Sequence, residues 1–320
     1  MPESDRFLFV VNPAAGGGRP ARLVTAVSRG VEESGGAVRL VRTEGPGHAR
    51  QLARDAAAWA SVVVAVGGDG TVNEVAAGLL DVGGAGGGHV PALSVVPAGT
   101  GNDFVRAAAL GHHPDRLVAG LLRPDERALD VGLVRWTGEH GTQGAGCFVN
   151  ALGAGLDAEV AYDAARRKRL GTRWGGLLAY AAGVASALRR LDCPAATIHG
   201  RLGGDERLLL DGPLLMAAVG NGPWVGGGFH LAPGARLDDG RLDACLVRGV
   251  TRGRAARLLP AAMRGRHIDA PEVSLHPLDG LRATFARPVR VHVDGEVLPE
   301  RVAGLDVRVE TGRLRLRGGA

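Results

Sequence analysis

The chain has 320 residues, of which 45% are hydrophobic and 22% charged, and its formal net charge is +5. Its 52 glycines and 17 prolines together make up roughly 22% of the residues, below the disordered range and without a collagen repeat. The modest charge and the 4% aromatic content argue against a nucleic-acid partner, because such proteins use concentrated basic surfaces and stacking rings. A globular protein of one large or two moderate domains remains.

The first part of the chain alternates strand and helix patterns. Between the strand candidates, apolar residues recur at helical spacing, for example Leu23, Val27 and Val31. This alternation predicts stacked βαβ units around a parallel sheet that is covered on both faces. The strands are expected at residues 7–11, 37–42, 62–66 and 92–97.

After about residue 128, short apolar runs separated by Gly, Asp or Pro turns become dominant. This pattern predicts an antiparallel sandwich or barrel. Two helical segments interrupt it, at about 157–190 and 252–264. The expected strands are residues 129–136, 147–152, 207–210, 213–219, 242–248, 281–285, 289–293, 305–309 and 313–317.

The cysteines and the apolar stretches indicate the compartment. Cys147, Cys193 and Cys245 are far apart and form no CxxC pair, which is typical of reduced thiols in a cytoplasmic protein. The first residues run into a strand pattern without a signal-peptide pattern. The longest apolar stretch, residues 175–188, is too short to span a bilayer. We therefore expect a cytoplasmic protein.

Three glycine-rich stretches follow expected strands at one edge of the parallel sheet: Asn12–Gly18, Gly67–Glu74 and Pro97–Phe104. Open α/β sheets bind ligands at this edge, and glycine lets backbone N–H groups approach a phosphate. The first stretch alone is equally typical of an ordinary turn. The second is more specific, because it places the carboxylate of Asp69 among three glycines, although Asp-Gly is also a common turn dipeptide.

With these stretches, and with Val293-Asp-Gly-Glu296 near the C-terminus, the sequence resembles the diacylglycerol kinase catalytic domain family, in particular its bacterial soluble lipid kinases of the DgkB and YegS-like group. The resemblance implies an α/β nucleotide-binding domain like that of NAD kinases and phosphofructokinases over residues 1–128. It implies a C-terminal β-sandwich domain for the lipid over residues 129–320, whose last strand returns to the N-terminal domain. The implied activity is ATP- and Mg²⁺-dependent phosphorylation of the hydroxyl of diacylglycerol or of a related lipid alcohol.

The resemblance also assigns roles to residues. Asp69 is the metal-linked carboxylate, and Glu296 matches the carboxylate that deprotonates the acceptor hydroxyl; from the residues alone, a hairpin turn residue is the less favoured interpretation of Glu296. Some relatives carry a lysine after the first Asn-Pro turn, where this chain has Gly17 and Gly18 and then Arg19. The residues implied on the nucleotide side are Asn12, Thr43, Gly67, Gly68, Asp69, Gly70, Thr71, Val72, Asn73, Thr100, Asn102 and Asp103.

A fourth stretch, Ala232–Asp243, resembles a structural Mg²⁺ loop of the bacterial members. Carried over, the carboxylate of Asp239 and the backbone carbonyls of Arg236 and Arg241 ligate the ion. Oxygen ligands suit Mg²⁺. An ordinary Asp-Asp-Gly turn explains the same residues as well.

A lipid kinase must reach its substrate at the membrane surface. The basic residues Arg166–Arg169 and Arg173 precede the apolar stretch, and the loop 221–229 carries glycines and aromatic residues. We expect peripheral contact with the inner membrane face through them, although a solvated face before a core helix explains the basic residues too. The sequence leaves the oligomeric state open, and a homodimer is the form that the general frequency of oligomers favours. The alternative functions are an NAD kinase-like small-molecule kinase and a non-catalytic nucleotide-binding regulator.

Overall fold

The computed structural model describes residues 5–18, 20–84, 89–99, 101–169 and 176–319. The chain divides into an N-terminal unit of Met1–Val131 and Thr311–Ala320 and a C-terminal unit of Gly132–Glu310. Two long strands, β5 (Glu126–Gly138) and β15 (Val302–Arg317), contribute residues to both units.

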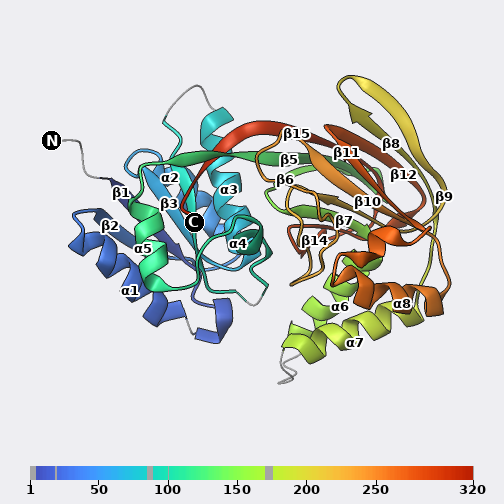
Figure 1. Ribbon diagram of the computed structural model, residues 1–320, viewed down its shortest axis with the longest axis horizontal. Coiled ribbons are helices and arrows are strands. Elements are labelled where there is room, and N and C mark those ends of the chain that lie inside the picture. Colours follow the sequence, from blue (N-terminus) through green and yellow to red (C-terminus); the bar gives the residue numbers. More distant parts are fainter. Residues whose placement is uncertain (1–4, 19, 85–88, 100, 170–175, 320) are drawn as a thin grey trace. The chain divides into compact units, whose positions relative to one another are not determined.

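The N-terminal unit is built on a parallel sheet in the order β4-β3-β1-β2 (Figure 1). The end of β15 pairs in parallel with β4 at Leu316 and Leu93. Every residue of β3 and β4 is buried, because a parallel sheet covered on both faces needs apolar side chains on both. The four strands predicted here are confirmed as β1 (Arg6–Val11), β2 (Ala37–Arg42), β3 (Val62–Gly67) and β4 (Ala92–Pro97).

Helices cover both faces of this sheet (Figure 1). Helices α1 and α5 pack together on one face, and α2 and α3 pack together on the other. The core under α1 and α5 contains Phe7, Phe9 and Val27. The helical elements of the unit are η1 (Ala15–Gly18), α1 (Pro20–Glu33), α2 (His48–Ala56), α3 (Asp69–Gly84), α4 (Asp103–Ala107) and α5 (Pro114–Leu122).

The C-terminal unit is a sandwich of two largely antiparallel sheets that share β9 (Asp205–Gly220). The first half of β9 pairs with β8, and the second half pairs with β7 and β10. The further strands are β6 (Gln143–Phe148), β7 (Ala151–Gly155), β8 (Ala195–Leu202), β10 (Leu242–Arg248), β11 (Val273–Leu278), β12 (Gly280–Val289), β13 (Val291–Val293) and β14 (Glu296–Val297).

Several strand boundaries differ from the sequence prediction. The runs 207–210 and 213–219 form one strand, because Gly212 (φ 136°) lets β9 bend between the two sheets without a turn. The runs 305–309 and 313–317 likewise join in β15. The run 147–152 is instead divided between β6 and β7. Hydropathy alone does not distinguish a bend within a strand from a turn between two strands.

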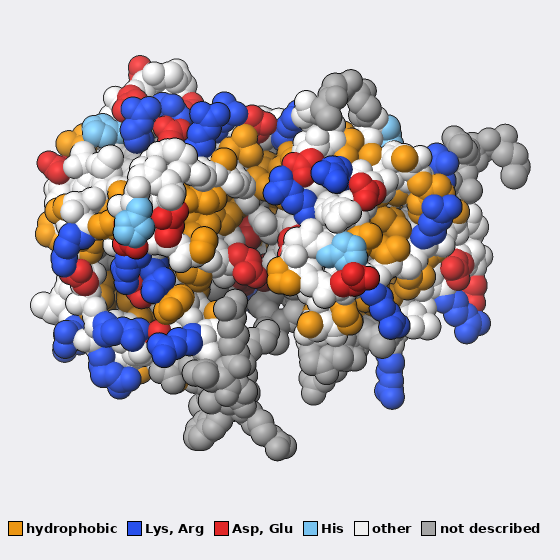
Figure 2. Space-filling view, turned by 180° about the vertical axis from the view of Figure 1, so that it is seen from behind, with side chains coloured by type: hydrophobic (Ala, Val, Ile, Leu, Met, Phe, Trp, Pro, Cys, Tyr) orange, Lys and Arg blue, Asp and Glu red, His pale blue; other side chains and the backbone are white. Residues whose placement is uncertain are grey.

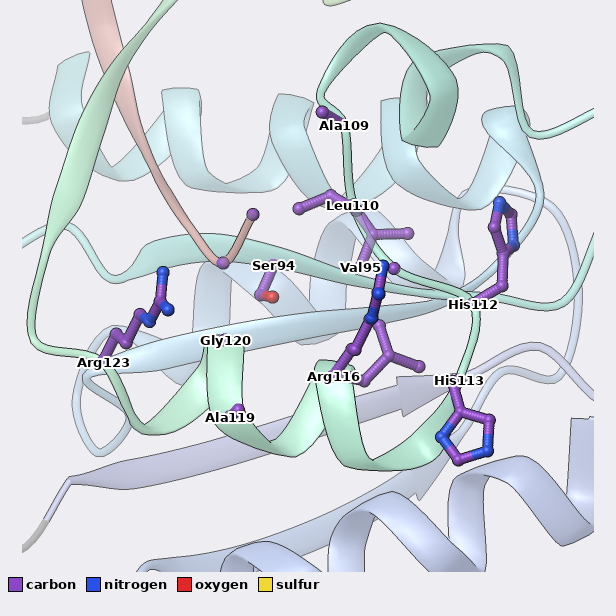
Figure 3. A pocket seen from close by; sticks show the side chains of 14 residues that line it. Ser94, Val95, Ala109, Leu110, His112, His113, Arg116, Ala119, Gly120 and Arg123 are labelled. Carbon is purple, nitrogen blue, oxygen red and sulfur yellow. The ribbon is translucent and has the colours of Figure 1, made fainter.

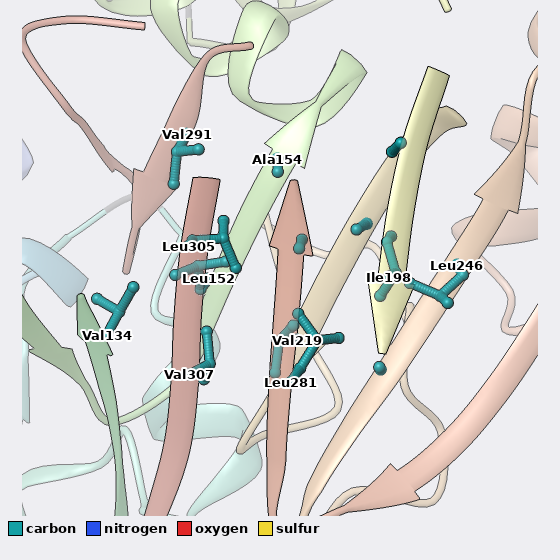
Figure 4. Packing of buried hydrophobic residues seen from close by; sticks show 14 of the residues in the cluster. Val134, Leu152, Ala154, Ile198, Val219, Leu246, Leu281, Val291, Leu305 and Val307 are labelled. Carbon is teal, nitrogen blue, oxygen red and sulfur yellow. The ribbon is translucent and has the colours of Figure 1, made fainter. Parts of the chain in front are cut away.

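Side-chain alternation along the strands produces two apolar layers. In β10, Leu242, Ala244 and Leu246 face the core between the sheets, part of which is drawn in Figure 4. Cys245 and Val247 face the opposite side, as the period of two in a strand requires. That side is covered by α6 (Leu156–Arg169), α7 (Gly176–Arg189) and α8 (Arg252–Ala262), with η2 (Arg266–Asp269) following α8.

Candidate active site

The first two glycine-rich loops are joined by hydrogen bonds at the carboxyl edge of the parallel sheet. The side-chain amide of Asn12, directly after β1, donates to the hydroxyl of Thr71 (3.0 Å). The Asn12 carboxamide oxygen accepts from the N–H of Ala14 (3.0 Å). Thr43 follows β2, and its N–H donates to the carbonyl of Val11 (2.9 Å). The ends of β1, β2 and β3 therefore lie at one edge, as parallel pairing requires.

The second and third loops are in contact through glycine. A Cβ on Gly99 would lie 2.4 Å from Cα of Gly68, and a Cβ on Gly67 would lie 2.3 Å from the hydroxyl oxygen of Thr71. The carboxylate of Asp69 accepts a hydrogen bond from the N–H of Phe104 (3.0 Å). The glycines are therefore required by contacts of the loops with their neighbours, a packing role beyond the access to a ligand expected from the sequence.

Helix α3 begins at Asp69, so the backbone N–H groups of its first turn have no partner within the helix. Those of Thr71 and Val72 donate to the carbonyl of Gly68. The Val72 side chain is part of the buried core, and its N–H is already used, so Val72 serves the packing of this turn. Gly70 and half-buried Asn73 complete this turn. The start of α3 combines a carboxylate with the positive end of a helix, which suits phosphate and its counter-ion.

The third loop is closed by Asn102. This residue has a positive φ of 53°, and its side-chain amide donates to the carbonyl of Gly99 and accepts from the Gly99 N–H. Asp103 is buried and forms an ion pair with Arg106 (3.2 Å). Thr100 and Arg19 lie outside the described residues.

Glu74 has a role that the sequence did not reveal. Its carboxylate accepts hydrogen bonds from the N–H groups of Gly47 (2.9 Å) and Ala49 (3.1 Å) at the start of α2. Two N–H groups at a helix start are thereby satisfied by one side chain. The last residue of the second motif thus holds α2 against α3, and the sequence signal for it is only the acidic residue itself.

Glu296 begins β14 and is exposed. It follows a two-residue turn in which both Asp294 (φ 46°) and Gly295 (φ 86°) have positive φ, the geometry preferred between hairpin strands. Among the described residues the Glu296 carboxylate has no ion-pair partner. A solvated carboxylate on a rigid turn is free to accept a proton from a bound molecule.

Asp294, the first residue of that turn, is a buried anchor. Its carboxylate accepts hydrogen bonds from the N–H groups of Val149 (2.9 Å), Asn150 (3.0 Å) and Ala151 (2.7 Å). These three amides form the link between β6 and β7. The carboxylate therefore joins the Glu296 hairpin to the neighbouring strands.

A second polar connection fixes the same hairpin. The N–H of Gly295 donates to Nδ1 of His292 (3.3 Å), so the neutral ring carries its hydrogen on Nε2. That nitrogen lies 3.3 Å from the carboxylate of Asp157 on α6. A Cβ on Gly153 would lie 1.8 Å from the Asp157 carboxylate and 2.4 Å from Nε2 of His292. Only glycine leaves room for this pair.

An apolar cavity of about 110 Å³ lies in the C-terminal unit between the sheet and the helices. Most of its wall is aliphatic or aromatic, from α6, α8, β9 and the 221–229 loop. Its polar lining consists of Asp157, His267 and His292, with Gly295 beside them. The cavity thus reaches the residue that precedes Glu296. Its apolar lining residues include Leu156, Val160, Leu215, Val225, Phe229, Leu258 and Val273.

The predicted metal loop carries oxygen donors. Asp239 accepts a hydrogen bond from the N–H of Arg241 (3.1 Å), and Arg236 pairs with Asp238 (3.5 Å). Burial, and then the charge of Asp239, raises the pKa of the Asp243 carboxyl above its ordinary value. Two carboxylates that repel each other in an oxygen-rich loop fit a hard divalent cation. Within the described residues no cluster of three His, Cys, Asp or Glu side chains is present, and the predicted set contains a single carboxylate.

A larger cavity of about 690 Å³ lies elsewhere in the N-terminal unit, beside α5 (Figure 3). Arg116 of α5 and Arg123, directly after α5, extend toward it, and Ser94 lies between them. The residues that line it include none of those predicted for the nucleotide. Size alone therefore does not identify the site.

The molecular surface is mixed in charge. On the face in Figure 2, Lys and Arg side chains lie among Asp and Glu side chains. Arg166 is exposed, whereas the side chains of residues 167–169 and residue Arg173 lie outside the described part of the chain. No helix within the described ranges has both the length and the apolar character needed to cross a bilayer.

The N-terminal unit is an α/β domain with glycine-rich loops suited to a nucleotide, and the C-terminal unit is a β-sandwich that carries the exposed carboxylate of Glu296. This combination is typical of a class of two-domain kinases. Residues 6–134 match the diacylglycerol kinase catalytic domain model, and residues 150–317 match the YegS C-terminal NAD kinase beta sandwich-like domain model. The chain belongs to this family of lipid and diacylglycerol kinases, in its YegS-like group.

Individual relatives agree with this assignment. A probable lipid kinase YegS-like protein of Xanthomonas campestris pv. campestris is 32% identical over 87% of this chain and 85% of its own length. The diacylglycerol kinase of Bacillus subtilis is 27% identical, with 91% and 89% covered.

Solved structures share the fold. A putative diacylglycerol kinase from Bacillus anthracis superposes with a TM-score of 0.74 at 20% identity, covering 100% of this chain and 99% of its own. Yeast NADH kinase superposes with a TM-score of 0.53 at 11% identity, covering 100% and 85%. The predicted fold class and family are thus confirmed, and membership of a kinase family implies use of ATP.

Proposed function

We propose that this protein transfers the γ-phosphate of ATP to the hydroxyl of diacylglycerol or of a related lipid alcohol. The observation that carries the proposal is the apolar cavity whose wall includes Gly295, the neighbour of Glu296. An acyl chain gains free energy by leaving water for such a lining. A soluble dinucleotide such as NAD has no acyl chain for which such an apolar lining would be favourable.

The proposed roles follow from the surroundings of each residue. Glu296 accepts the proton of the acceptor hydroxyl, because it is exposed and has no ion-pair partner among the described residues. Asp69 holds the nucleotide-linked Mg²⁺, which when bound screens the phosphate charges. Asn12, Thr43 and the third loop shape the nucleotide side, and Asp239 with the carbonyls of Arg236 and Arg241 holds a structural Mg²⁺.

The test is transfer of label from γ-labelled ATP into a total lipid extract, with identification of the product. We expect a labelled phospholipid. Parallel reactions contain NAD in place of lipid. Label on NAD alone would contradict the lipid kinase proposal and indicate an NAD kinase. The absence of a labelled product in both reactions would favour a non-catalytic regulator.

Peripheral membrane contact is a separate part of the proposal, supported by exposed Arg166 and by the lining of the apolar cavity by Val225 and Phe229 of the 221–229 loop. Co-sedimentation with vesicles of anionic and of purely zwitterionic lipid tests it. We expect binding that increases with anionic content. Protein that stays in the supernatant with both vesicles would exclude this contact.

A further inference from the structure

His267 is a polar residue in the wall of the apolar cavity, and none of the roles described so far uses it. The residue is 2% exposed, and it lies in η2 after α8. The ring lines the same cavity as Asp157, His292 and Gly295. A buried polar group normally has a partner for each of its hydrogen-bonding atoms.

The contacts of the ring define its tautomer. Nε2 lies 3.1 Å from the backbone carbonyl of Leu231, and a carbonyl only accepts hydrogen bonds, so Nε2 carries the hydrogen. Burial lowers the pKa of the ring, which keeps it neutral. The nearby Cys245 thiol, 3.6 Å from Nε2, is also neutral, because burial raises its pKa to about 12. Nδ1 is therefore a lone-pair acceptor.

Within the described part of the chain, this acceptor has no hydrogen-bond partner. Nδ1 of His267 is buried and receives no hydrogen bond from a described residue. The other histidine of the cavity differs, because both nitrogens of His292 have partners, Gly295 and Asp157. A ligand whose O–H or N–H group reaches Nδ1 from the cavity would satisfy it, and a pure hydrocarbon chain would leave it unsatisfied.

We propose that His267 is a substrate-binding residue whose Nδ1 accepts a hydrogen bond from the lipid, so that acceptor lipids with a second O–H or N–H group are preferred over diacylglycerol. This inference rests on the proposed lipid kinase function. Diacylglycerol has one hydroxyl, and that group is the one phosphorylated, so it brings no second donor. Lipids with a second donor include monoacylglycerols and N-acylated amino alcohols.

The test compares three acceptors with the same acyl chains in mixed micelles. They are diacylglycerol, its analogue with an amide N–H in place of the ester oxygen at position 2, and monoacylglycerol. We expect the kcat/KM of at least one donor-bearing lipid to exceed that of diacylglycerol about tenfold. This factor corresponds to the free-energy cost of leaving a buried acceptor without a hydrogen bond. Isothermal titration calorimetry of the same lipids measures the preference as a ratio of Kd values without turnover.

Two variants separate the acceptor from the fold. In His267→Gln the side-chain amide still donates to Leu231 but presents no acceptor at the position of Nδ1, so the preference is lost. In His267→Asn the carboxamide oxygen replaces Nδ1, so part of the preference remains. The control is His199→Gln, on β8 outside the cavity wall, which retains the wild-type ratio. Thermal unfolding verifies that each variant is folded.

The outcomes distinguish this inference from the proposed function. Equal use and equal binding of the three lipids by the wild type would overturn the inference alone, and so would a preference that survives in His267→Gln. Absence of any lipid phosphorylation would overturn the proposed function. A binding preference that disappears in His267→Gln would still support the acceptor role of His267.

Discussion

The side-chain amide of Asn12 donates a hydrogen bond of 3.0 Å to the hydroxyl of Thr71, joining the end of β1 to the first turn of α3. Asn12 also accepts a hydrogen bond from the N–H of Ala14. One asparagine thus shapes its own loop and attaches it to the next. Its role is to pre-organise the loop edge, independently of any contact that it makes with a ligand.

We expect Asn12→Ala and Thr71→Val to be coupled in their effects on the free energy of unfolding by about 1 kcal/mol, the usual net contribution of one hydrogen bond. Urea unfolding of the two single variants and the double variant measures the coupling. Strictly additive effects would show that this bond does not contribute in solution.

On the proposed role of Asp69 as the ligand of Mg²⁺, Asp69→Asn should lower kcat at least about 100-fold, because the amide lacks the negative charge of the carboxylate. The carboxamide oxygen can still accept the hydrogen bond from Phe104, so the melting temperature should change by less than about 2 °C. The transfer assay and thermal unfolding measure the two effects. Asp81→Asn, on the same helix in an ion pair with Arg50, is the control and should keep full turnover.

Gly99→Ala should destabilise the protein by about 1–3 kcal/mol and weaken nucleotide binding, because its Cβ would lie 2.4 Å from Cα of Gly68 and separate the two loops. Chemical unfolding and titration with ATP check both effects. Gly253→Ala in α8 has open space around its Cβ and should cause no loss. A Gly99 variant as stable as that control would contradict the close contact of the loops.

Asp294→Asn should destabilise the protein by about 2–3 kcal/mol. The new NH₂ group would face a backbone N–H that now donates a hydrogen bond to the carboxylate, so two donors would meet without an acceptor. Asparagine tolerates the positive φ of this position, so backbone strain does not add to the effect. The matched control is Asp279→Asn, where the carboxylate of a half-buried residue accepts a solvent-exposed hydrogen bond from the N–H of Gly203. We expect less than about 1 kcal/mol there, and equal losses in the two variants would refute the anchor role.

Asp243 gives a prediction about pH. Burial and the charge of Asp239 raise its pKa in the folded state, so folding favours the protonated form. Its stabilising contribution is complete below the ordinary pKa of Asp and is lost as the pH rises through the raised folded value. Asp243→Asn should therefore be more stable than the wild type at pH 7 and show no such advantage at pH 3, as measured by urea unfolding.

The same loop gives a prediction about Mg²⁺. Millimolar Mg²⁺ should raise the melting temperature of the wild type at pH 7, because a ligand of the folded state stabilises it. The shift should be absent in Asp239→Asn and reversed by EDTA in the wild type. An equal shift in both proteins would place the ion elsewhere.

Much of the N-terminal unit was predictable from the sequence, because strands buried on both faces are continuous apolar runs and parallel strands end at a common edge. Residues 62–66 and 92–97 became β3 and β4 with nearly the predicted bounds. The position of the three glycine-rich loops at that edge followed directly. In the C-terminal unit the prediction covers β10 in full and other strands in part, but it lacks β8 and β11 and places turns where β9 and β15 only bend.

The sequence by itself determined the fold class, the family and the residues that follow the strands, because these depend on local hydropathy and on short motifs. The tertiary structure decided what the polar residues contact. Asp294 holds amides about 145 residues away, and Asp157 reaches His292 across 135 residues. Such partners depend on how the strands cross the two sheets, and a single sequence contains no local signal for that path. The same reason applies to Nδ1 of His267, which has no partner among the described residues, because burial and hydrogen bonding are properties of the packed chain.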